Sequence, residues 1–267
     1  MTRDDLNFFK EWFSGYCRTF SSGELEDQKN IDLKKRHTLK VCENITEISE
    51  RLSLDENRRL LAEAVALFHD IGRFPQYAEY KTFRDSISVN HGLLGAKTLR
   101  ETRVLHNLSS EEQETIIQSV MFHNAFAVPQ KMREGIIFFV KLIRDADKLD
   151  IWRVFLEHYE GAEESRASAV GLGLPELPEY SEEVLSQLHE RRIVSLSAIR
   201  SLNDFKLLQL SWIFDLNFIP SFVLVSERKY IERIAAHLPA TEPIRGLSAM
   251  LNGFVRERIS DLQEDRR

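Results

Sequence analysis

The stretch AVALFHDIGRF, residues 64–74, decides the fold. Its first five residues are apolar, and they end at the polar pair His69 and Asp70. Apolar residues upstream recur at three- and four-residue spacing, so we expect an amphipathic helix that ends near His69 and a break at Gly72 and Pro75. Because an ionised carboxylate is costly to bury alone, Asp70 must be paired, protonated or bound to a metal ion.

Helical periodicity continues on both sides of this stretch. We expect a second helix to begin near Ile31. Ser53 with Glu56, and Ser109 with Glu112, have the spacing of a capping box, which predicts that a helix starts at each. Further helices are expected over residues 89–105 and 136–159 and in the chain beyond residue 180. The sequence therefore predicts an all-α fold.

Two segments interrupt the helical pattern. Residues 74–90 have little periodicity and many aromatic and basic side chains, which predicts a long and functional loop. Residues 162–180 hold two glycines and two prolines and are expected to form an irregular connection. We therefore expect a helical core over residues 1–165 and a C-terminal helical extension over residues 180–267. Residues 222–225 could form a short strand, although their flanks favour a helix.

Polar residues on otherwise apolar helix faces mark a candidate site. His37 shares a face with Val41 and Ile48, and Asp147 follows the apolar run IIFFVKLI. A single histidine on such a face is more often an ordinary core residue, but here several helices each direct a histidine or aspartate inward. These residue types suit divalent metal ions, and the candidate ligands are His37, His69, Asp70, His91, His123 and Asp147.

Composition narrows the class of protein. The chain has 267 residues, 43% of them hydrophobic, and a net charge of −6, which argues against binding of extended nucleic acid. Its two cysteines, Cys17 and Cys42, form no CxxC motif and are expected to be reduced, as in a cytoplasmic protein. The N-terminus lacks the pattern of a signal peptide, and no apolar run is long enough to cross a membrane.

The segment 64–74 resembles the signature of the HD-domain superfamily. The order His37, His69 with Asp70, then Asp147 is similar to the four-residue metal motif of that family. The resemblance covers roughly residues 31–160. It implies an all-helical HD-domain bundle, followed here by additional C-terminal helices, in which these four residues bind one metal ion.

A second metal ion is implied by the two remaining histidines. Some HD proteins hold two ions, with the aspartate of the pair bridging them, and this resemblance assigns the bridge to Asp70 and the second ion to His91 and His123. The sequence departs from the cyclic-dinucleotide phosphodiesterases of this superfamily, because Asn124 replaces their second adjacent histidine and the Gly-Tyr-Pro signature is missing. The lysine often found after HDxG is Arg73 here.

The leading hypothesis is a phosphohydrolase that uses a water activated by two metal ions. Its substrate would be a nucleotide or related phosphate ester, cleaved as a monoester or a diester. Asp70, the expected bridge between the ions, and Arg73 are the expected catalytic residues. Arg73 is chosen because a guanidinium binds phosphate in a bidentate manner. The expected substrate-binding cations are Arg73, Lys81, Arg84 and Lys148. Asp145 and Asp150 are interpreted as helix-end or salt-bridge residues.

Two other functions stay open. Some HD-domain proteins with the same six-ligand order use a mixed-valent di-iron centre as oxygenases, and others have lost ligands and act as non-catalytic regulatory modules. Histidine and aspartate accept several divalent metals, so the two ions could be Mn, Fe, Ni, Co, Mg or Zn. The sequence gives no expectation for the oligomeric state.

Overall fold

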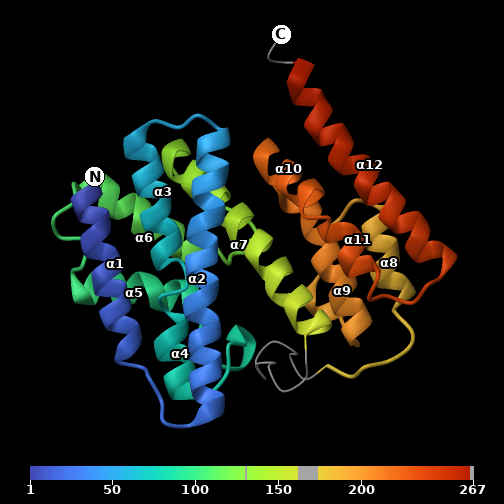
Figure 1. The fold of residues 1–267 in the computed structure, drawn as a ribbon, viewed down its shortest axis with the longest axis horizontal. Coiled ribbons are helices and arrows are strands. Elements are labelled where there is room, and N and C mark those ends of the chain that lie inside the picture. Colours follow the sequence, from blue (N-terminus) through green and yellow to red (C-terminus); the bar gives the residue numbers. More distant parts are fainter. Residues whose placement is uncertain (130, 162–173, 265–267) are drawn as a thin grey trace. The chain divides into compact units, whose positions relative to one another are not determined.

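The computed structural model describes residues 1–129, 131–161 and 174–264, and all regular secondary structure in these ranges is helical (Figure 1). The predicted all-α fold is confirmed. The chain divides into two compact units, and the division falls between Asp150 and Ile151. Our domain limits of 1–165 and 180–267 stay predictions.

The first unit holds the histidines of the candidate site. Its elements are α1 (Arg3–Arg18), α2 (Leu25–Arg51), α3 (Glu56–Phe68), α4 (Arg73–Tyr80), the short 3-10 helix η1 (Asp85–Ile87), α5 (His91–Thr102), α6 (Ser110–Phe122) and the first part of α7 (Glu134–Glu160). Phe9, Ile45, Phe68 and Ile116 are fully buried, and they come from four of these helices. This apolar core fixes the helices whose polar residues form the site.

The helix starts agree only in part with the predicted caps. Ser109 and Glu112 form the expected capping box of α6. The box predicted for Ser53 is wrong, because Asp55 caps α3 by accepting from the backbone N–H of Arg58 at 2.8 Å. Helix α2 begins at Leu25, earlier than predicted. The residue before it, Glu24, makes no side-chain capping hydrogen bond. A helix without such a bond leaves no capping signal in the sequence.

The prediction of an unbroken loop over residues 74–90 is wrong, because α4 and η1 occupy much of it. Phe74 and Tyr77 lie one turn apart and are both buried, which gives α4 an apolar face. Pro75 does not break this helix, since the N–H groups of a first turn have no intrahelical partner and proline is tolerated there. Lys81 ends α4 in a left-handed conformation with a φ of 53°.

The second unit contains the end of α7 and the predicted C-terminal helices. The helices are α8 (Glu182–His189), η4 (Leu196–Ala198), α9 (Leu202–Ser211), η5 (Trp212–Asp215), α10 (Ile219–Glu227), α11 (Tyr230–Ala235) and α12 (Glu242–Glu264). Trp152 is buried in this unit and its indole N–H donates to the carbonyl of Gln209 at 3.0 Å. Residues 222–225 lie within α10, so they are helical, and the 162–173 part of the expected irregular connection lies outside the described residues.

The length and the apolar character of the described helices decide whether they could span a membrane. None of them, within the described ranges, combines the length and the apolar character that a bilayer crossing requires.

Candidate metal centre

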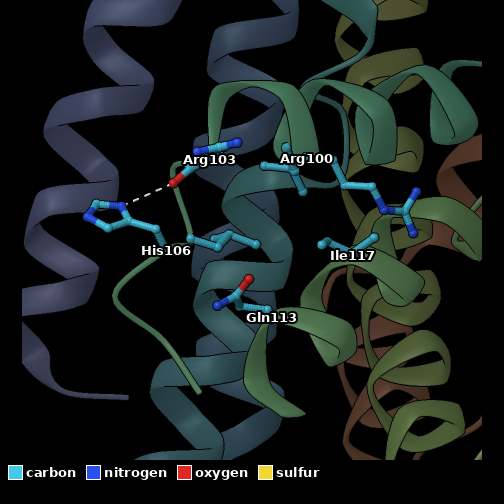
Figure 2. Close-up of a pocket in the computed structure, with 7 residues that line it drawn as sticks. Arg100, Arg103, His106, Gln113 and Ile117 are labelled. Atoms are coloured by element: carbon cyan, nitrogen blue, oxygen red, sulfur yellow. Dashed lines mark hydrogen bonds between the residues drawn. The ribbon is translucent and has the colours of Figure 1, made fainter. Parts of the chain in front are cut away.

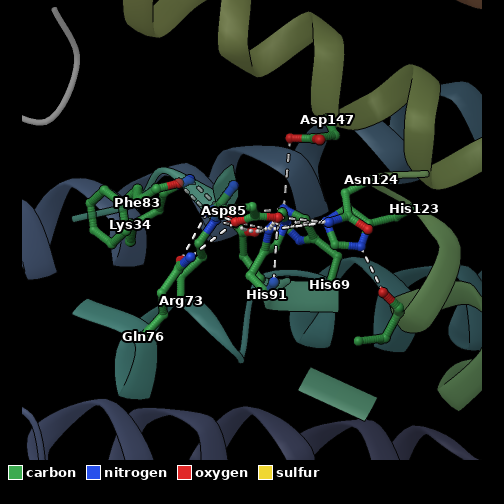
Figure 3. A network of polar contacts seen from close by, with 12 residues as sticks. Lys34, His69, Arg73, Gln76, Phe83, Asp85, His91, His123, Asn124 and Asp147 are labelled. Atoms are coloured by element: carbon green, nitrogen blue, oxygen red, sulfur yellow. Dashed lines mark hydrogen bonds and ion pairs between the residues drawn. The ribbon is translucent and has the colours of Figure 1, made fainter. Parts of the chain in front are cut away.

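Four helices bring one histidine each to a common point. His37 lies in the middle of α2, His91 is the first residue of α5, and His69 and His123 follow the last residues of α3 and α6. All four side chains are buried, and Figure 3 shows His69, His91 and His123 together with Asp147 of α7, whose carboxylate contacts His37 and His69. The structure therefore brings together residues that are up to 110 positions apart in the sequence.

Asp70 lies between two pairs of these histidines. Its Oδ2 atom is 3.6 Å from Nε2 of His37 and 3.7 Å from Nε2 of His69. Its Oδ1 atom is 3.4 Å from Nε2 of His91 and 3.8 Å from Nε2 of His123. One carboxylate thus offers a different oxygen to each pair, which is the arrangement of a ligand that bridges two ions.

Asp147 completes the first of these clusters. Its Oδ1 atom is 3.0 Å from Nε2 of His37 and 3.7 Å from Nε2 of His69. The same oxygen is buried and has no hydrogen-bond partner. Because an unsatisfied buried carboxylate oxygen is costly, this atom is placed as the ligand of a cation would be.

The Nδ1 atoms of His37 and His69 face away from the centre. Nδ1 of His37 is 2.6 Å from a carboxylate oxygen of Asp150, and Nδ1 of His69 donates to the backbone carbonyl of Ala66 at 2.7 Å. Acceptors at this position hold the proton on Nδ1 and turn Nε2 inward. Asp150 is thus a salt-bridge residue, as expected, but its partner is a candidate metal ligand.

The second pair is held in the same way. Nδ1 of His91 is 2.7 Å from Oδ2 of Asp85, and Nδ1 of His123 donates to the carbonyl of Val120 at 2.7 Å. Asn124 adds its amide, 3.1 Å from Asp85. Metal-binding histidines in proteins usually donate their second ring N–H to a carboxylate or a carbonyl, and all four histidines here have such a partner.

The inward Nε2 atoms fit a metal ion better than they fit each other. Those of His91 and His123 are 3.0 Å apart, and those of His37 and His69 are 3.3 Å apart. The His91 and His123 rings direct Nδ1 at an acceptor, so their Nε2 atoms present lone pairs that repel at 3.0 Å; His37, whose pKa is raised to about 9, does not share this repulsion while it is protonated. A cation between them removes the repulsion, and the donor set of imidazole and carboxylate is one that first-row divalent metals accept.

Burial and nearby charges shift the pKa values of these rings. Burial lowers the pKa of His69 to about 4, and burial together with Arg73 lowers that of His91 to about 3. Both rings are therefore neutral at pH 7. Burial and Lys34 also act to lower the pKa of His37, but Asp147 and Asp150 outweigh them and raise it to about 9.

Two cations lie against the central carboxylate. Nζ of Lys34, on α2, is 2.8 Å from Oδ2 of Asp70, and Nε of Arg73 is 3.4 Å from Oδ1. Arg73 also donates to Asp85 at 2.8 Å and to the carbonyl of Phe83. The Phe83 ring lies under both cations, with its centroid 5.3 Å from Lys34 and 5.9 Å from Arg73.

The other predicted substrate-binding cations are placed differently. Lys81 pairs with Asp27 and its side chain is 58% exposed. Arg84 is exposed beside η1, and Nζ of Lys148 is 3.4 Å from the carbonyl of Arg144. Arg73 is thus the predicted cation that contacts Asp70, and the roles of the other three stay predictions.

Sequence reasoning missed the parts played by Lys34 and Asp85. Lys34 precedes His37 by three residues, so the helical spacing that located the histidine also places this lysine on the same face. Asp85 lies six residues before His91 in a segment without periodicity, and no sequence pattern pairs the two. The α4–η1 fold brings them together.

Comparison with known proteins identifies the domain. Residues 35–152 match the family model of the HD domain, a range that contains all six candidate ligands. No curated protein and no solved structure matches the chain.

Proposed function

We propose, since residues 35–152 form an HD domain, that this protein is a metal-dependent phosphohydrolase with a dinuclear centre. One observation carries the proposal. The two oxygens of Asp70 face two separate histidine pairs, and two cations lie against the same carboxylate. Histidine pairs of this kind suit metal ions, and adjacent cations suit an anionic substrate.

The ligands divide into two sets that share Asp70. His37, His69 and Asp147 would hold one ion, and His91 with His123 would hold the other. Two bound divalent ions would supply an activated water and would neutralise charge on a phosphate oxygen. The outward partners of the four rings keep Nε2 directed at the ions, so little reorganisation is needed when they bind.

Lys34 and Arg73 would bind the phosphate. In the structure Lys34 neutralises Oδ2 of Asp70, an oxygen that would instead ligate an ion in the loaded site. Its ammonium would then be available to a phosphate oxygen at the edge of the centre. Arg73 is held by Asp85 and by the carbonyl of Phe83, so its guanidinium is fixed beside Asp70. Both residues would thus orient the ester for attack by water.

The first test combines metal content with an activity screen. Protein purified without chelator is analysed for metals, and hydrolysis of phosphomonoesters and phosphodiesters is measured with Mn, Fe, Ni, Co, Mg or Zn. We expect about two ions per chain and hydrolysis of at least one ester class. Asp70→Ala should lose both ions and all activity. Asp32→Ala, on the exposed side of α2, is the matched control and should keep both.

Other outcomes would contradict the proposal. Two irons with oxygen uptake and no hydrolysis would assign the protein to the HD-domain oxygenases. Neither metal nor activity would leave a binding module. A second variant tests the cation: Lys34→Gln should raise KM for the ester about tenfold or more, because a charged hydrogen bond to phosphate is lost. Arg36→Gln, two residues along and exposed, should leave KM unchanged.

A further inference from the structure

A pocket lies in the first unit between residues of α5 and α6 (Figure 2). Its volume is about 340 Å³, and it is formed by the end of α5, the turn that follows, and the first turns of α6. This volume is within the range of small-molecule sites. The metal centre does not use any residue that lines the pocket.

The lining of the pocket has two chemical parts. Leu99, Leu105 and Ile117 are buried and give it an apolar surface. Arg100, Arg103 and His106 lie on it as exposed basic side chains. A ligand that fits both parts has an anionic group joined to an apolar one.

The basic groups are free to bind such a ligand. Neither Arg100 nor Arg103 forms an ion pair with any residue that the structure describes. The acids nearest to them in sequence have other partners, since Glu101 faces Lys97 at 3.8 Å and Glu111 faces Arg133 at 3.9 Å. The whole chain has a net charge of −6, whereas two guanidinium groups without an acidic partner among the described residues make the surface of this pocket locally positive.

Local backbone geometry shapes the turn that carries Arg103 and His106. Arg103 ends α5 in the left-handed conformation, with a φ of 53°, and so turns the chain toward α6. His106 contacts the carbonyl of Arg103 through Nδ1 at 3.1 Å, which directs its Nε2 atom away from the backbone. Gln113 is tied to the carbonyl of Leu108 at 2.9 Å, so the turn between the two helices is braced at both ends.

The pocket is separate from the metal centre although the same helices form both. His91 begins α5, and Arg100 follows nine residues later, which is about 14 Å along a helix axis. His123 follows the last residue of α6, whereas Gln113 lies near its start. An anion in this pocket would therefore not be the ester bound at Asp70.

We propose that the pocket formed by Leu99, Arg100, Arg103, Leu105, His106 and Ile117 binds a small phosphorylated molecule with an apolar group. The guanidinium groups of Arg100 and Arg103 bind the phosphate oxygens, and the leucine and isoleucine side chains contact the apolar part. The inference does not depend on the chemistry of the metal centre.

Isothermal titration calorimetry with phenylphosphonate tests this site. The probe has a phosphonate joined to a ring and no ester bond that could be hydrolysed. It is titrated into full-length protein stripped of metal, so that bound ions contribute no affinity. We expect saturable binding to one site, weakened about tenfold or more in the double variant Arg100→Gln with Arg103→Gln. Arg133→Gln, an exposed arginine of the same unit, is the matched control and should bind as wild type does.

Each other outcome overturns the proposal. Equal affinity in the double variant would place the anion elsewhere, for example at Lys34 and Arg73, and absence of saturable binding would show that no such site exists. Inorganic phosphate is a second probe, and it should bind more weakly than phenylphosphonate because it has no apolar group. Equal affinity for the two probes would show that the pocket does not recognise an apolar group. Circular dichroism checks the fold, and Arg100→Gln alone decides the matter if the double variant is misfolded.

Discussion

The Nε2 atoms of His91 and His123 lie 3.0 Å apart, and the Nδ1 atom of each ring contacts an acceptor on its outer side. Both rings therefore direct a lone pair at the same small volume, next to Oδ1 of Asp70. This arrangement is unfavourable in a site that binds nothing, and it becomes favourable when a cation lies between the rings.

Replacement of His91 should remove one ion and leave the other. His91→Ala deletes a ligand of the second set only, while His37, His69, Asp147 and Asp70 remain. We expect metal content to fall from about two ions per chain to about one, measured by elemental analysis after dialysis. His189→Ala, an exposed histidine at the end of α8, is the control. Equal metal content in wild type and His91→Ala would contradict the assignment of two sites.

Asp85 should matter for the affinity of the second ion without binding it. Its carboxylate contacts Nδ1 of His91 and also accepts from Arg73 and Gln76. Asp85→Asn keeps the size but removes the charge that orients the ring. We expect affinity for the second ion to fall about 10- to 100-fold, measured by metal titration, with the first ion unaffected. Asp32→Asn should change neither, and an unchanged titration for Asp85→Asn would show that His91 is oriented by other groups.

Gly72 should tolerate no side chain. A Cβ atom added there would lie 2.2 Å from the carbonyl oxygen of His91 and 2.6 Å from the backbone N of Gly95, and neither atom can move without shifting α5. We expect Gly72→Ala to lower the free energy of unfolding by about 1–3 kcal/mol in urea denaturation. It should also weaken binding of the second ion, because α5 carries His91.

Gly135 provides the matched control for this substitution. It lies in the first turn of α7 and a Cβ atom there would meet nothing within 4 Å. Gly135→Ala should therefore stay within about 1 kcal/mol of wild type. If Gly72→Ala were equally harmless, the close approach of α5 to the turn after Asp70 would not be important for stability.

The two thiols should be unreactive in the folded protein. Cys17 and Cys42 are free and buried, and burial raises the pKa of Cys17 to about 12 and that of Cys42 as well. Only the thiolate reacts, and at pH 8 about one Cys17 thiol in ten thousand is ionised. An aromatic disulfide reagent should release no chromophore from native protein at pH 8 and two equivalents after denaturation. Rapid reaction of the native protein would show that α1 and α2 open.

Helical spacing could predict the inward positions of His37, His69 and Asp147, because it reports which side chains face inward, whereas the assignment of His91 and His123 to a second ion rested on the resemblance to the HD-domain family. His37 and Asp147 follow this rule, and His69 with Asp70 end a buried, apolar helical stretch. The structure brings all six together, which periodicity alone cannot establish, since it does not say which helices are neighbours.

Other features depend on contacts that a local pattern does not contain. Helix α4 is short, so its two buried aromatic residues gave too few repeats to distinguish a helix from a loop, and Pro75 added a misleading signal. The cap of α3 required a choice between Ser53 and Asp55, and the left-handed φ of 55° at Ser53 assigns that residue to the preceding turn. Asp85 meets His91 only because the chain folds back through η1.

The composition of the ligand set has a consequence for charge balance. Asp70 and Asp147 contribute two negative charges, whereas His69 and His91 are neutral at pH 7 because their pKa values are low. Two divalent ions, Lys34 and Arg73 would carry six positive charges, and the four carboxylates of Asp70, Asp147, Asp85 and Asp150 carry four negative ones, so two positive charges would remain uncompensated. A phosphate monoester dianion restores electroneutrality there, whereas an uncharged polyol does not. The loaded centre would therefore select its substrate first by charge, and inorganic phosphate, the product of such a reaction, would remain bound as an inhibitor.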